Sequence, residues 1–262
     1  MNKLTIIAGN CILEDMNTSI ETARFLTDLS KKYGYELIFK SSFKKDNRSS
    51  AEYYTGPGLE ESVKIFKRIK EEFGVRVITD FHNLYELDTE MVDVIDILQL
   101  PAYLCMQTEL TLKMAKTGKP INIKKGQFLH PEDVIHVVRK VENAGNKNIQ
   151  ITERGTSFGY RDLVVDPKSF HILKSFGYPV FFDAGHSVRK YGVPSADLAK
   201  GGQKEFIYTL ARAAIACKID GIFVETHPNP TVAKCDAATQ LSFEEFEKLV
   251  REIMPIWQVL HK

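Results

Sequence analysis

The chain alternates short apolar runs with longer segments in which apolar residues recur at helical spacing. The runs are rich in β-branched residues, as buried strands are, and eight of them occur: Leu4–Ala8, Glu36–Lys40, Arg76–Phe81, Ile97–Leu100, Pro120–Ile123, Asn148–Thr152, Pro179–Asp183 and Gly221–Glu225. Two clear helical segments are Leu59–Lys70 and Pro131–Val141, the second with proline in its first turn. Strand and helix therefore alternate along the whole chain.

Strict alternation of strand and helix predicts a parallel sheet with right-handed crossovers. Eight such units in 262 residues have the number and size of a (β/α)8 barrel. The alternative is an open doubly wound sheet, which usually carries a glycine-rich turn after its first strand. Neither GxGxxG nor GxxxxGK[ST] occurs in this sequence. We therefore expect an α/β protein with one domain, a (β/α)8 TIM barrel over residues 1–262.

The composition excludes several function classes. The formal net charge is +1, so neither a nucleic acid nor a membrane surface is expected as a partner. No apolar run approaches the roughly 18 residues that span a bilayer, and the first strand-like run begins at Leu4, which leaves no room for a signal peptide. The cysteines lack CxxC spacing, which favours a reduced, cytoplasmic protein: Cys11, Cys105, Cys217 and Cys235.

Polar residues follow every one of the eight runs. The active site of a barrel enzyme lies at the carboxyl ends of its strands, and charged side chains there are costly unless they are paired or bind a ligand. The pattern therefore indicates an enzyme. The residues at these ends are Cys11, Lys40 to Ser42, Asp80 with His82, Gln99, Lys124 with Lys125, Glu153 with Arg154, Asp183 with His186, and Glu225.

Five basic residues at these strand ends or in the loop after the second run would repel one another unless an anion lay among them. They are Lys40, Lys45, Arg48, Lys124 and Arg154. Phosphate and carboxylate groups suit both arginine forks and lysine point charges. For any single member the alternative of a solvent-facing side chain stays open, as we expect for Lys44.

A second group carries the ligand types of a borderline divalent metal, namely thiolate, imidazole and carboxylate. Its members are Cys11, His186, Glu225 and Asp236. They follow the first, seventh and eighth runs, which adjoin one another in a closed barrel. The alternative for Cys11 is a small buried apolar residue, the commoner fate of a lone cysteine. The place of Cys235, next to Asp236, stays open.

The stretch Lys40–Ser50 resembles a motif of the 3-deoxy-D-manno-octulosonate 8-phosphate synthase family. Further motifs match in order over nearly the whole chain: Gly56–Glu60, Thr79–His82, Gln99–Ala102, Lys124–Phe128, Glu153–Gly155, Phe158–Asp166, Phe182–Ser187 and Glu225–Pro230. The resemblance implies a barrel that condenses phosphoenolpyruvate with arabinose 5-phosphate, releases phosphate and serves lipopolysaccharide biosynthesis. It also implies a homotetramer whose sites are completed by a neighbouring subunit.

The resemblance also assigns residues. Its metal-dependent subclass has cysteine at the position of Cys11, which implies a divalent metal ion (zinc, iron, manganese or cobalt) on Cys11, His186, Glu225 and Asp236. Phosphoenolpyruvate would be bound by Lys40, Ser42, Lys45, Gln99, Lys124 and Arg154. The sugar phosphate would be bound by Asn47, Arg48, Ser49 and Asp80. The catalytic residues would be Lys45, Asn47, Asp80 and His186.

Several positions depart from the family pattern on the acceptor and metal side. Met106 replaces an arginine that the resemblance implies reaches a neighbouring subunit's sugar phosphate. The other departures are Asn83 for glutamate, Gly185 for threonine and Ala237 for glycine. The acceptor phosphate is then held by Arg48 with Arg189 or Lys190, or the protein uses another aldose.

Two further alternatives concern the function itself. One is a barrel that has lost activity and only binds a metabolite, which the retained basic group disfavours. The other is a related synthase of the chorismate pathway that uses erythrose 4-phosphate, which the Asn47–Ser50 stretch disfavours. Residues 187–203 contain several glycines, which predicts a lid over the site, with a disordered surface excursion as the alternative.

Overall fold

A computed structural model describes residues 3–46, 50, 52–158, 161–194, 197–198 and 200–261. In this part of the chain parallel strands close into a barrel in the order β1-β10-β9-β6-β5-β4-β3-β2. The strands are β1 (Thr5–Gly9), β2 (Glu36–Lys40), β3 (Arg76–Asp80), β4 (Ile97–Leu100), β5 (Ile121–Lys124), β6 (Ile149–Glu153), β9 (Val180–Asp183) and β10 (Gly221–Glu225). The eight predicted runs are these eight strands, so the (β/α)8 barrel is confirmed.

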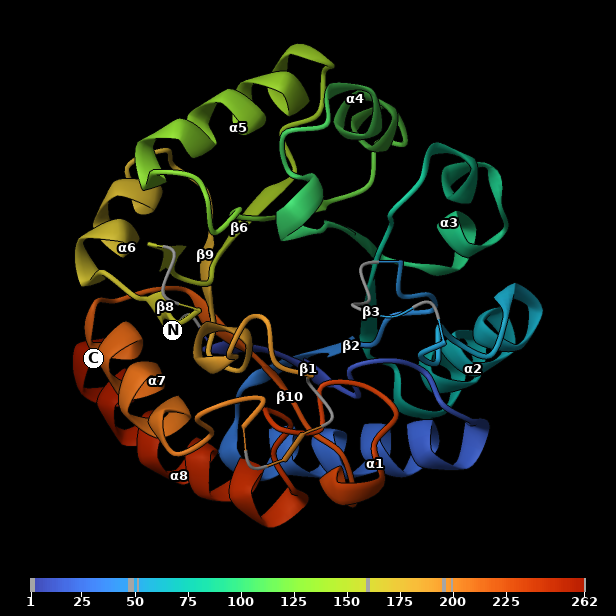
Figure 1. Ribbon diagram of the computed structural model, residues 1–262, viewed down its shortest axis with the longest axis vertical. Helices are drawn as coiled ribbons and strands as arrows, with labels where there is room; N and C mark the ends of the chain where they lie inside the picture. The colour runs from blue at the N-terminus through green and yellow to red at the C-terminus, as the bar shows by residue number, and fades with distance from the viewer. Residues whose placement is uncertain are drawn as a thin grey trace.

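Helices surround the barrel as an outer ring (Figure 1). They are α1 (Met16–Tyr33), α2 (Leu59–Phe73), α3 (Met91–Val94), α4 (Thr108–Lys116), α5 (Val134–Asn143), α6 (Pro167–Lys174), α7 (Phe206–Ala216) and α8 (Phe243–Leu260). The predicted helix from Pro131 differs in its first turn, which is the 3-10 helix η3 (Pro131–Asp133), and α5 begins at Val134. Among the described residues no helix has the length and apolarity that crossing a membrane requires.

Two hydrophobic clusters hold the barrel. The larger one packs the outward faces of the strands against the helices. The smaller one fills the barrel interior with side chains from six strands: Ile7, Ile38, Ile78, Ile97, Phe181 and Phe223. Because successive strand residues point to opposite sides, this layer determines which residues face the mouth of the barrel.

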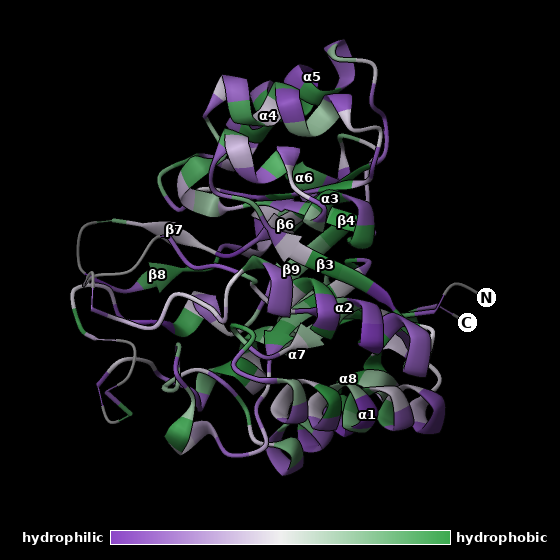
Figure 2. Ribbon diagram, turned by 90° about the vertical axis from the view of Figure 1, so that its right-hand side faces the viewer, coloured by the Kyte–Doolittle hydropathy of each residue, from purple (hydrophilic) through white to green (hydrophobic). Residues whose placement is uncertain are grey.

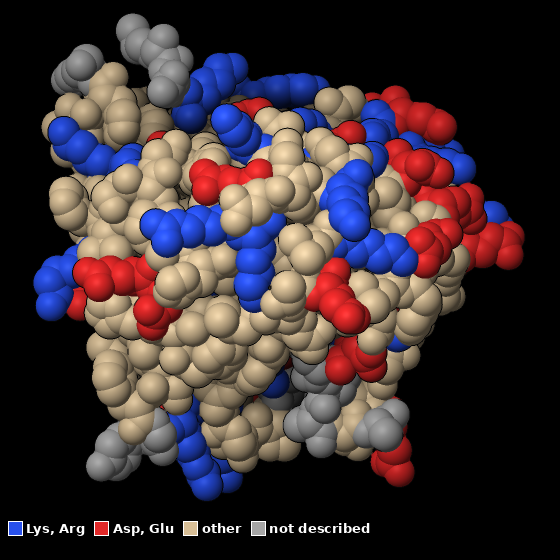
Figure 3. Space-filling view, turned by 90° about the horizontal axis from the view of Figure 1, so that it is seen from above, with Lys and Arg blue, Asp and Glu red and all other residues tan. Residues whose placement is uncertain are grey.

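The carboxyl ends of the strands carry the longest excursions of the chain. A short antiparallel hairpin, β7 (Thr156–Ser157) with β8 (Leu163–Val164), follows β6 and was not predicted. Figure 2 shows it at the end of the barrel opposite the two termini. In the predicted lid, Arg189 pairs with Gly202 across the base of the loop. The face seen in Figure 3 carries basic and acidic side chains interspersed, in keeping with the balanced net charge.

Candidate active site

Side chains alternate between the two sides of each strand, and this alternation places polar side chains in the mouth of the barrel. Two positions beyond five members of the interior apolar layer, and therefore on the same side of their strands, stand Lys40, Asp80, Gln99, Asp183 and Glu225. All five are buried. At the end of β5 the same rule separates the last residue of the strand, Lys124, from Lys125, which follows it. Lys124 faces the cavity, whereas the Lys125 ammonium faces away from it and donates to the Gly155 carbonyl oxygen at 3.0 Å.

The strand ends enclose one cavity that brings most of the predicted residues together. The predicted residues that line it are Lys40, Lys45, Asp80, Gln99, Lys124, Arg154, His186, Glu225 and Asp236. Arg189, one of the two alternatives for the acceptor phosphate, lines it as well. Side chains that line it without having been placed there by the sequence are Tyr53, Tyr103 and Cys235. Ser42 lies beneath this surface and its hydroxyl contacts the Lys40 ammonium at 3.0 Å. Asn47, Arg48 and Ser49 lie outside the described residues.

Asp80 holds two lysines on one side of the cavity. Its carboxylate lies 3.3 Å from the Lys40 ammonium and 3.8 Å from that of Lys45. Burial raises the pKa of Asp80, but the two ammonium groups outweigh it and hold the pKa well below 3.8. Burial also lowers the pKa of Lys45, yet Cys11 and Asp80 outweigh it and keep the pKa well above 10.5. Asp80 and Lys45 are therefore both charged near neutral pH.

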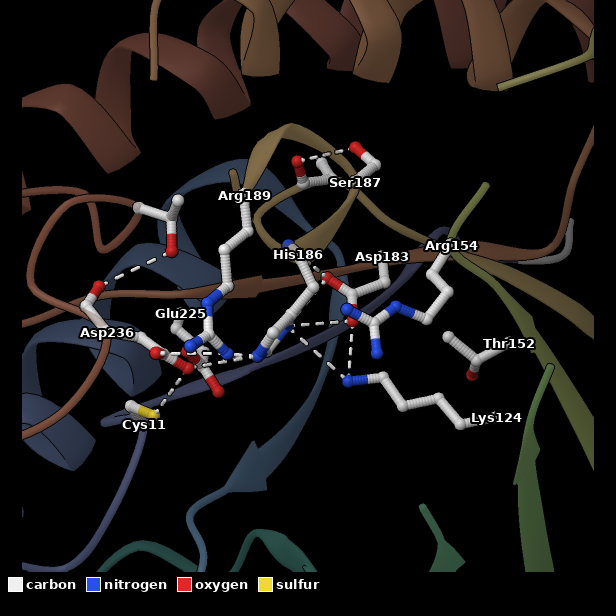
Figure 4. Close-up of polar contacts among 12 residues, drawn as sticks. Cys11, Lys124, Thr152, Arg154, Asp183, His186, Ser187, Arg189, Glu225 and Asp236 are labelled. Atoms are coloured by element: carbon white, nitrogen blue, oxygen red, sulfur yellow. Dashed lines mark hydrogen bonds and ion pairs between the residues drawn. The ribbon is translucent and has the colours of Figure 1, made fainter. Parts of the chain in front are cut away.

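Asp183 joins the basic group to the metal-ligand group (Figure 4). Its carboxylate lies 2.5 Å from the Lys124 ammonium and 2.9 Å from the His186 Nδ1, and it accepts from the His186 backbone N–H at 2.9 Å. Burial lowers the pKa of Lys124, while Asp183 opposes that shift. Burial raises the pKa of Asp183, but His186 and Lys124 outweigh it and hold it far below its usual value. Because Nδ1 faces Asp183, the His186 Nε2 faces Glu225 and Asp236.

The Arg154 guanidinium lines the cavity and is not paired with the adjacent Glu153 carboxylate, which interacts with other groups. The Glu153 carboxylate accepts from the backbone N–H of Arg154 at 2.9 Å and lies 3.3 Å from Lys125. The Arg154 guanidinium donates to the Tyr191 hydroxyl. Its Nε is buried and has no hydrogen-bond partner in the described part of the chain. Buried donors without partners are uncommon, so this atom is available to an anion.

The predicted metal ligands converge on Asp236. Its Oδ2 lies 3.4 Å from the His186 Nε2 and 3.5 Å from the Cys11 sulfur, and Nε2 lies 3.9 Å from Glu225. Glu225 Oε1 is buried without a hydrogen-bond partner among the described residues. A thiol, an imidazole and two carboxylates at these separations, with an acceptor oxygen left over, fit a divalent metal ion. Asp183 supplies the partner that a metal-bound histidine usually has on its other nitrogen.

Cys235 belongs to the same cluster, a point the sequence left open. Its sulfur lies 2.9 Å from that of Cys11, and no disulfide is present among the described residues. The Gln240 side chain joins the two segments, since it accepts from the Cys11 backbone N–H at 3.2 Å and donates to the Cys235 carbonyl at 2.8 Å. Burial and the neighbouring Cys235 raise the pKa of Cys11 well above 9.0. The adjacency of Cys235 to Asp236 was the only sequence signal for this placement.

Asp236 is held in position by backbone and charge together. Its φ is 42°, in the left-handed region that side chains other than glycine seldom adopt. Burial raises its pKa, but Arg189 and His186 outweigh it and keep the pKa well below 3.8. The Arg189 guanidinium lies 3.5 Å from Asp236 Oδ1. Lys190, its predicted alternative, lines a separate surface groove.

None of the four positions that depart from the family pattern lines this cavity. Met106 is 41% exposed and does not line the cavity of its own chain. Asn83 donates to the Asp46 carboxylate at 2.8 Å. At Gly185 an added Cβ would find its nearest neighbour at 3.7 Å, so the site has room for a side chain there. Ala237 is buried directly after Asp236.

Known proteins resemble this chain over nearly its whole length. A 2-dehydro-3-deoxyphosphooctonate aldolase of Trichlorobacter lovleyi is 45% identical over 253 residues, which cover 97% of this chain and 92% of that protein. Proteins of the same name from Protochlamydia amoebophila and Fusobacterium nucleatum are both 44% identical, over 99% and 98% of this chain and 93% and 92% of their own. The resemblance seen in the motifs is thereby confirmed. Residues 1–258 match the DAHP synthetase I family, and the chain belongs to it.

Proposed function

We propose that the protein condenses phosphoenolpyruvate with arabinose 5-phosphate to give 3-deoxy-D-manno-octulosonate 8-phosphate and inorganic phosphate. The relatives named for the corresponding octulosonate phosphate support this acceptor over erythrose 4-phosphate. The observation that carries the proposal is one cavity in which Lys40, Lys45, Lys124 and Arg154 surround space beside a metal-ligand cluster. A donor with both a phosphate and a carboxylate fits such a set of cations.

Phosphoenolpyruvate binding is assigned to the basic side of the cavity. Lys40, Lys45, Lys124 and Arg154 supply paired positive charges, and Gln99 lies among them. Asp183 favours the protonated form of Lys124 at a separation of 2.5 Å. The condensation proceeds without an imine, so Lys124 serves as an anion binder and not as a nucleophile. A ketoacid donor without the phosphate would lose part of this binding energy.

The metal is assigned to Cys11, His186, Glu225 and Asp236. A bound divalent ion would supply Lewis-acid polarisation or an activated water in the reaction. Asp183 fixes the His186 ring so that Nε2 faces the two carboxylates. Cys235 adds a second sulfur beside Cys11, which favours a thiophilic ion within the expected set of zinc, iron, manganese and cobalt.

The remaining chemistry is acid–base work by the chain's own residues. Carbon 3 of phosphoenolpyruvate attacks the aldehyde carbon of the sugar, whose carbonyl oxygen takes up a proton and becomes a hydroxyl. Water then adds at carbon 2, where positive character develops, and loses a proton. Cleavage of the bond between carbon 2 and the phosphate oxygen releases inorganic phosphate and leaves the ketone. Lys45 lines the cavity, and its ammonium is the proton donor we assign. Asp80, 3.8 Å away, orients Lys45 and stabilises its charge. We assign acceptor binding to Asn47, Arg48 and Ser49 on the family resemblance.

Assembly and location are further parts of the proposal. Tyr103, Met106 and Phe128 are 44%, 41% and 54% exposed on the loops after β4 and β5. Apolar residues of this size at one end of a barrel support contact with another copy of the chain. With the homotetramer that the family resemblance implies, this leads us to propose a tetramer, to be checked by light scattering of the purified protein. A cytoplasmic location remains an expectation from the sequence.

The test is consumption of phosphoenolpyruvate with arabinose 5-phosphate, measured before and after chelation and after each metal is added back. Turnover that chelation abolishes and metal restores would support both the acceptor and the metal. Turnover that survives complete chelation would refute the metal role. Turnover only with erythrose 4-phosphate or another aldose would refute the acceptor, and consumption with no acceptor at all would refute the synthase.

A further inference from the structure

Arg189 occupies an unusual place between the two halves of the site. It directly follows the turn η4 (His186–Val188), whose first residue is a proposed metal ligand. Its guanidinium lies 3.5 Å from Asp236, another proposed ligand, yet the same side chain lines the cavity with Lys124 and Arg154. One cation therefore touches the metal-ligand cluster while it faces the space assigned to the substrate.

The Arg189–Asp236 contact leaves both partners incompletely satisfied. Asp236 Oδ1 faces the guanidinium only as an ion pair at 3.5 Å and has no hydrogen-bond partner among the described residues. The Arg189 Nε is likewise buried without a hydrogen-bond partner there. The Asp236 side chain is 5% exposed and the Arg189 side chain 21%. A largely buried charge pair with unused hydrogen-bonding capacity on both sides is poorly compensated for its desolvation. The guanidinium and the carboxylate would each be better stabilised by another partner that uses this free hydrogen-bonding capacity.

Backbone contacts fix the position of Arg189, and its side chain lies between the Asp236 carboxylate and the cavity. Arg189 pairs with Gly202, and the Gln203 N–H donates to the Val188 carbonyl at 2.9 Å. These contacts anchor the base of the loop that follows β9. The guanidinium lies 5.9 Å from the centre of the Tyr191 ring, and the Arg154 guanidinium lies at the same distance from that ring. Both guanidinium groups therefore lie near the same ring, and both arginines line the cavity.

We propose that Arg189 is a substrate-binding residue whose availability depends on the metal site. When no metal is bound, Arg189 neutralises Asp236. When a divalent ion takes Asp236, the guanidinium is released to an anionic group, phosphate or carboxylate, of a substrate in the same cavity. Metal and substrate consequently bind with positive coupling, and each tightens the other by the same factor. This inference rests on the proposed metal site.

The test measures metal affinity by titrating Co²⁺ into chelator-stripped protein and following the sulfur-to-cobalt absorption band. Each titration is run alone, with saturating phosphoenolpyruvate, and with saturating arabinose 5-phosphate, one substrate at a time so that no turnover occurs. The variants are Arg189→Gln, Arg189→Lys and, as a matched control, Lys190→Gln. Thermal unfolding confirms that each variant is folded.

We expect Arg189→Gln to bind Co²⁺ about tenfold more tightly than the wild type without substrate, because the competing cation is gone. A substrate should tighten Co²⁺ about tenfold in the wild type and by less than twofold in Arg189→Gln. The substrate that shows this coupling is the one that Arg189 contacts. Arg189→Lys should keep part of the coupling, and Lys190→Gln should behave as the wild type.

Two results would overturn the inference while the proposed function stands. One is an Arg189→Gln protein that binds Co²⁺ no more tightly than the wild type. The other is substrate coupling that persists undiminished in that variant. A wild-type protein that shows no cobalt band at any concentration would instead overturn the metal site itself, and with it this inference.

Discussion

Asp183→Asn tests whether one buried carboxylate supports both halves of the site. The substitution preserves shape and removes the negative charge from a fully buried position. Lys124 at 2.5 Å and the His186 ring at 2.9 Å both lose a charged partner. Removing one member of a buried ion pair costs about 3–5 kcal/mol, and each 1.4 kcal/mol is tenfold in a rate or affinity. We expect kcat/KM for phosphoenolpyruvate to fall by about 10²- to 10³-fold.

The pH profile of Asp183→Asn separates this electrostatic role from a general loss of structure. Burial lowers the pKa of Lys124, and Asp183 opposes that shift more than Glu225 does, so the variant removes the larger opposing charge. Protonated Lys124 is the binding form and is present below its pKa. The alkaline limb of kcat/KM should therefore move to lower pH in the variant.

The control for this experiment is Asp220→Asn, which makes the same change at the other end of the barrel. Asp220 accepts from the Val180 N–H at 2.8 Å and lies 3.4 Å from Lys174, far from the cavity-facing ends of the strands. We expect Asp220→Asn to lower stability and leave the alkaline limb where it is. An Asp183→Asn enzyme with an unchanged alkaline limb would refute the reasoning.

Three further substitutions test separate parts of the site. Cys11→Ala should lower both kcat and the amount of bound metal, which elemental analysis measures. The control Cys217→Ala, at the end of α7, should change neither. An unchanged metal content in Cys11→Ala would show that Cys11 is not a ligand. Met106→Arg should lower the apparent KM for arabinose 5-phosphate by restoring a charge-assisted contact, and an unaltered KM means that position 106 does not meet the phosphate. Gly9→Ala would place a Cβ 2.0 Å from the Lys40 carbonyl oxygen. The free energy of unfolding in urea should therefore fall by at least about 1–3 kcal/mol. An unchanged urea midpoint would show that β1 and β2 can move apart to accommodate the added methyl group.

The candidate site was readable in part because a parallel barrel gathers its strand ends. Lys40 and Glu225 end an apolar run, and Asp80 and Gln99 stand one residue before the end of theirs. Closure of the sheet brings such ends to one mouth whatever the details of packing. The period of two along a strand then separates cavity-facing from outward-facing residues. Lys124 and Lys125 illustrate the limit of that reading, because the choice between them depends on which face of β5 is inside.

What the sequence determined by itself was the order of elements and the chemistry available at each strand end. Strands of a parallel barrel are buried on both faces, so they are continuous apolar runs rich in β-branched residues. Eight such runs between helical segments therefore predict eight strands. Only the tertiary structure decided which of those groups meet. Cys235 reaches Cys11, and Arg189 reaches Asp236, through loops whose paths depend on contacts such as the Gln240 bridge. Such distances follow from barrel closure and loop packing, which join residues far apart in the chain and leave no local periodicity to read.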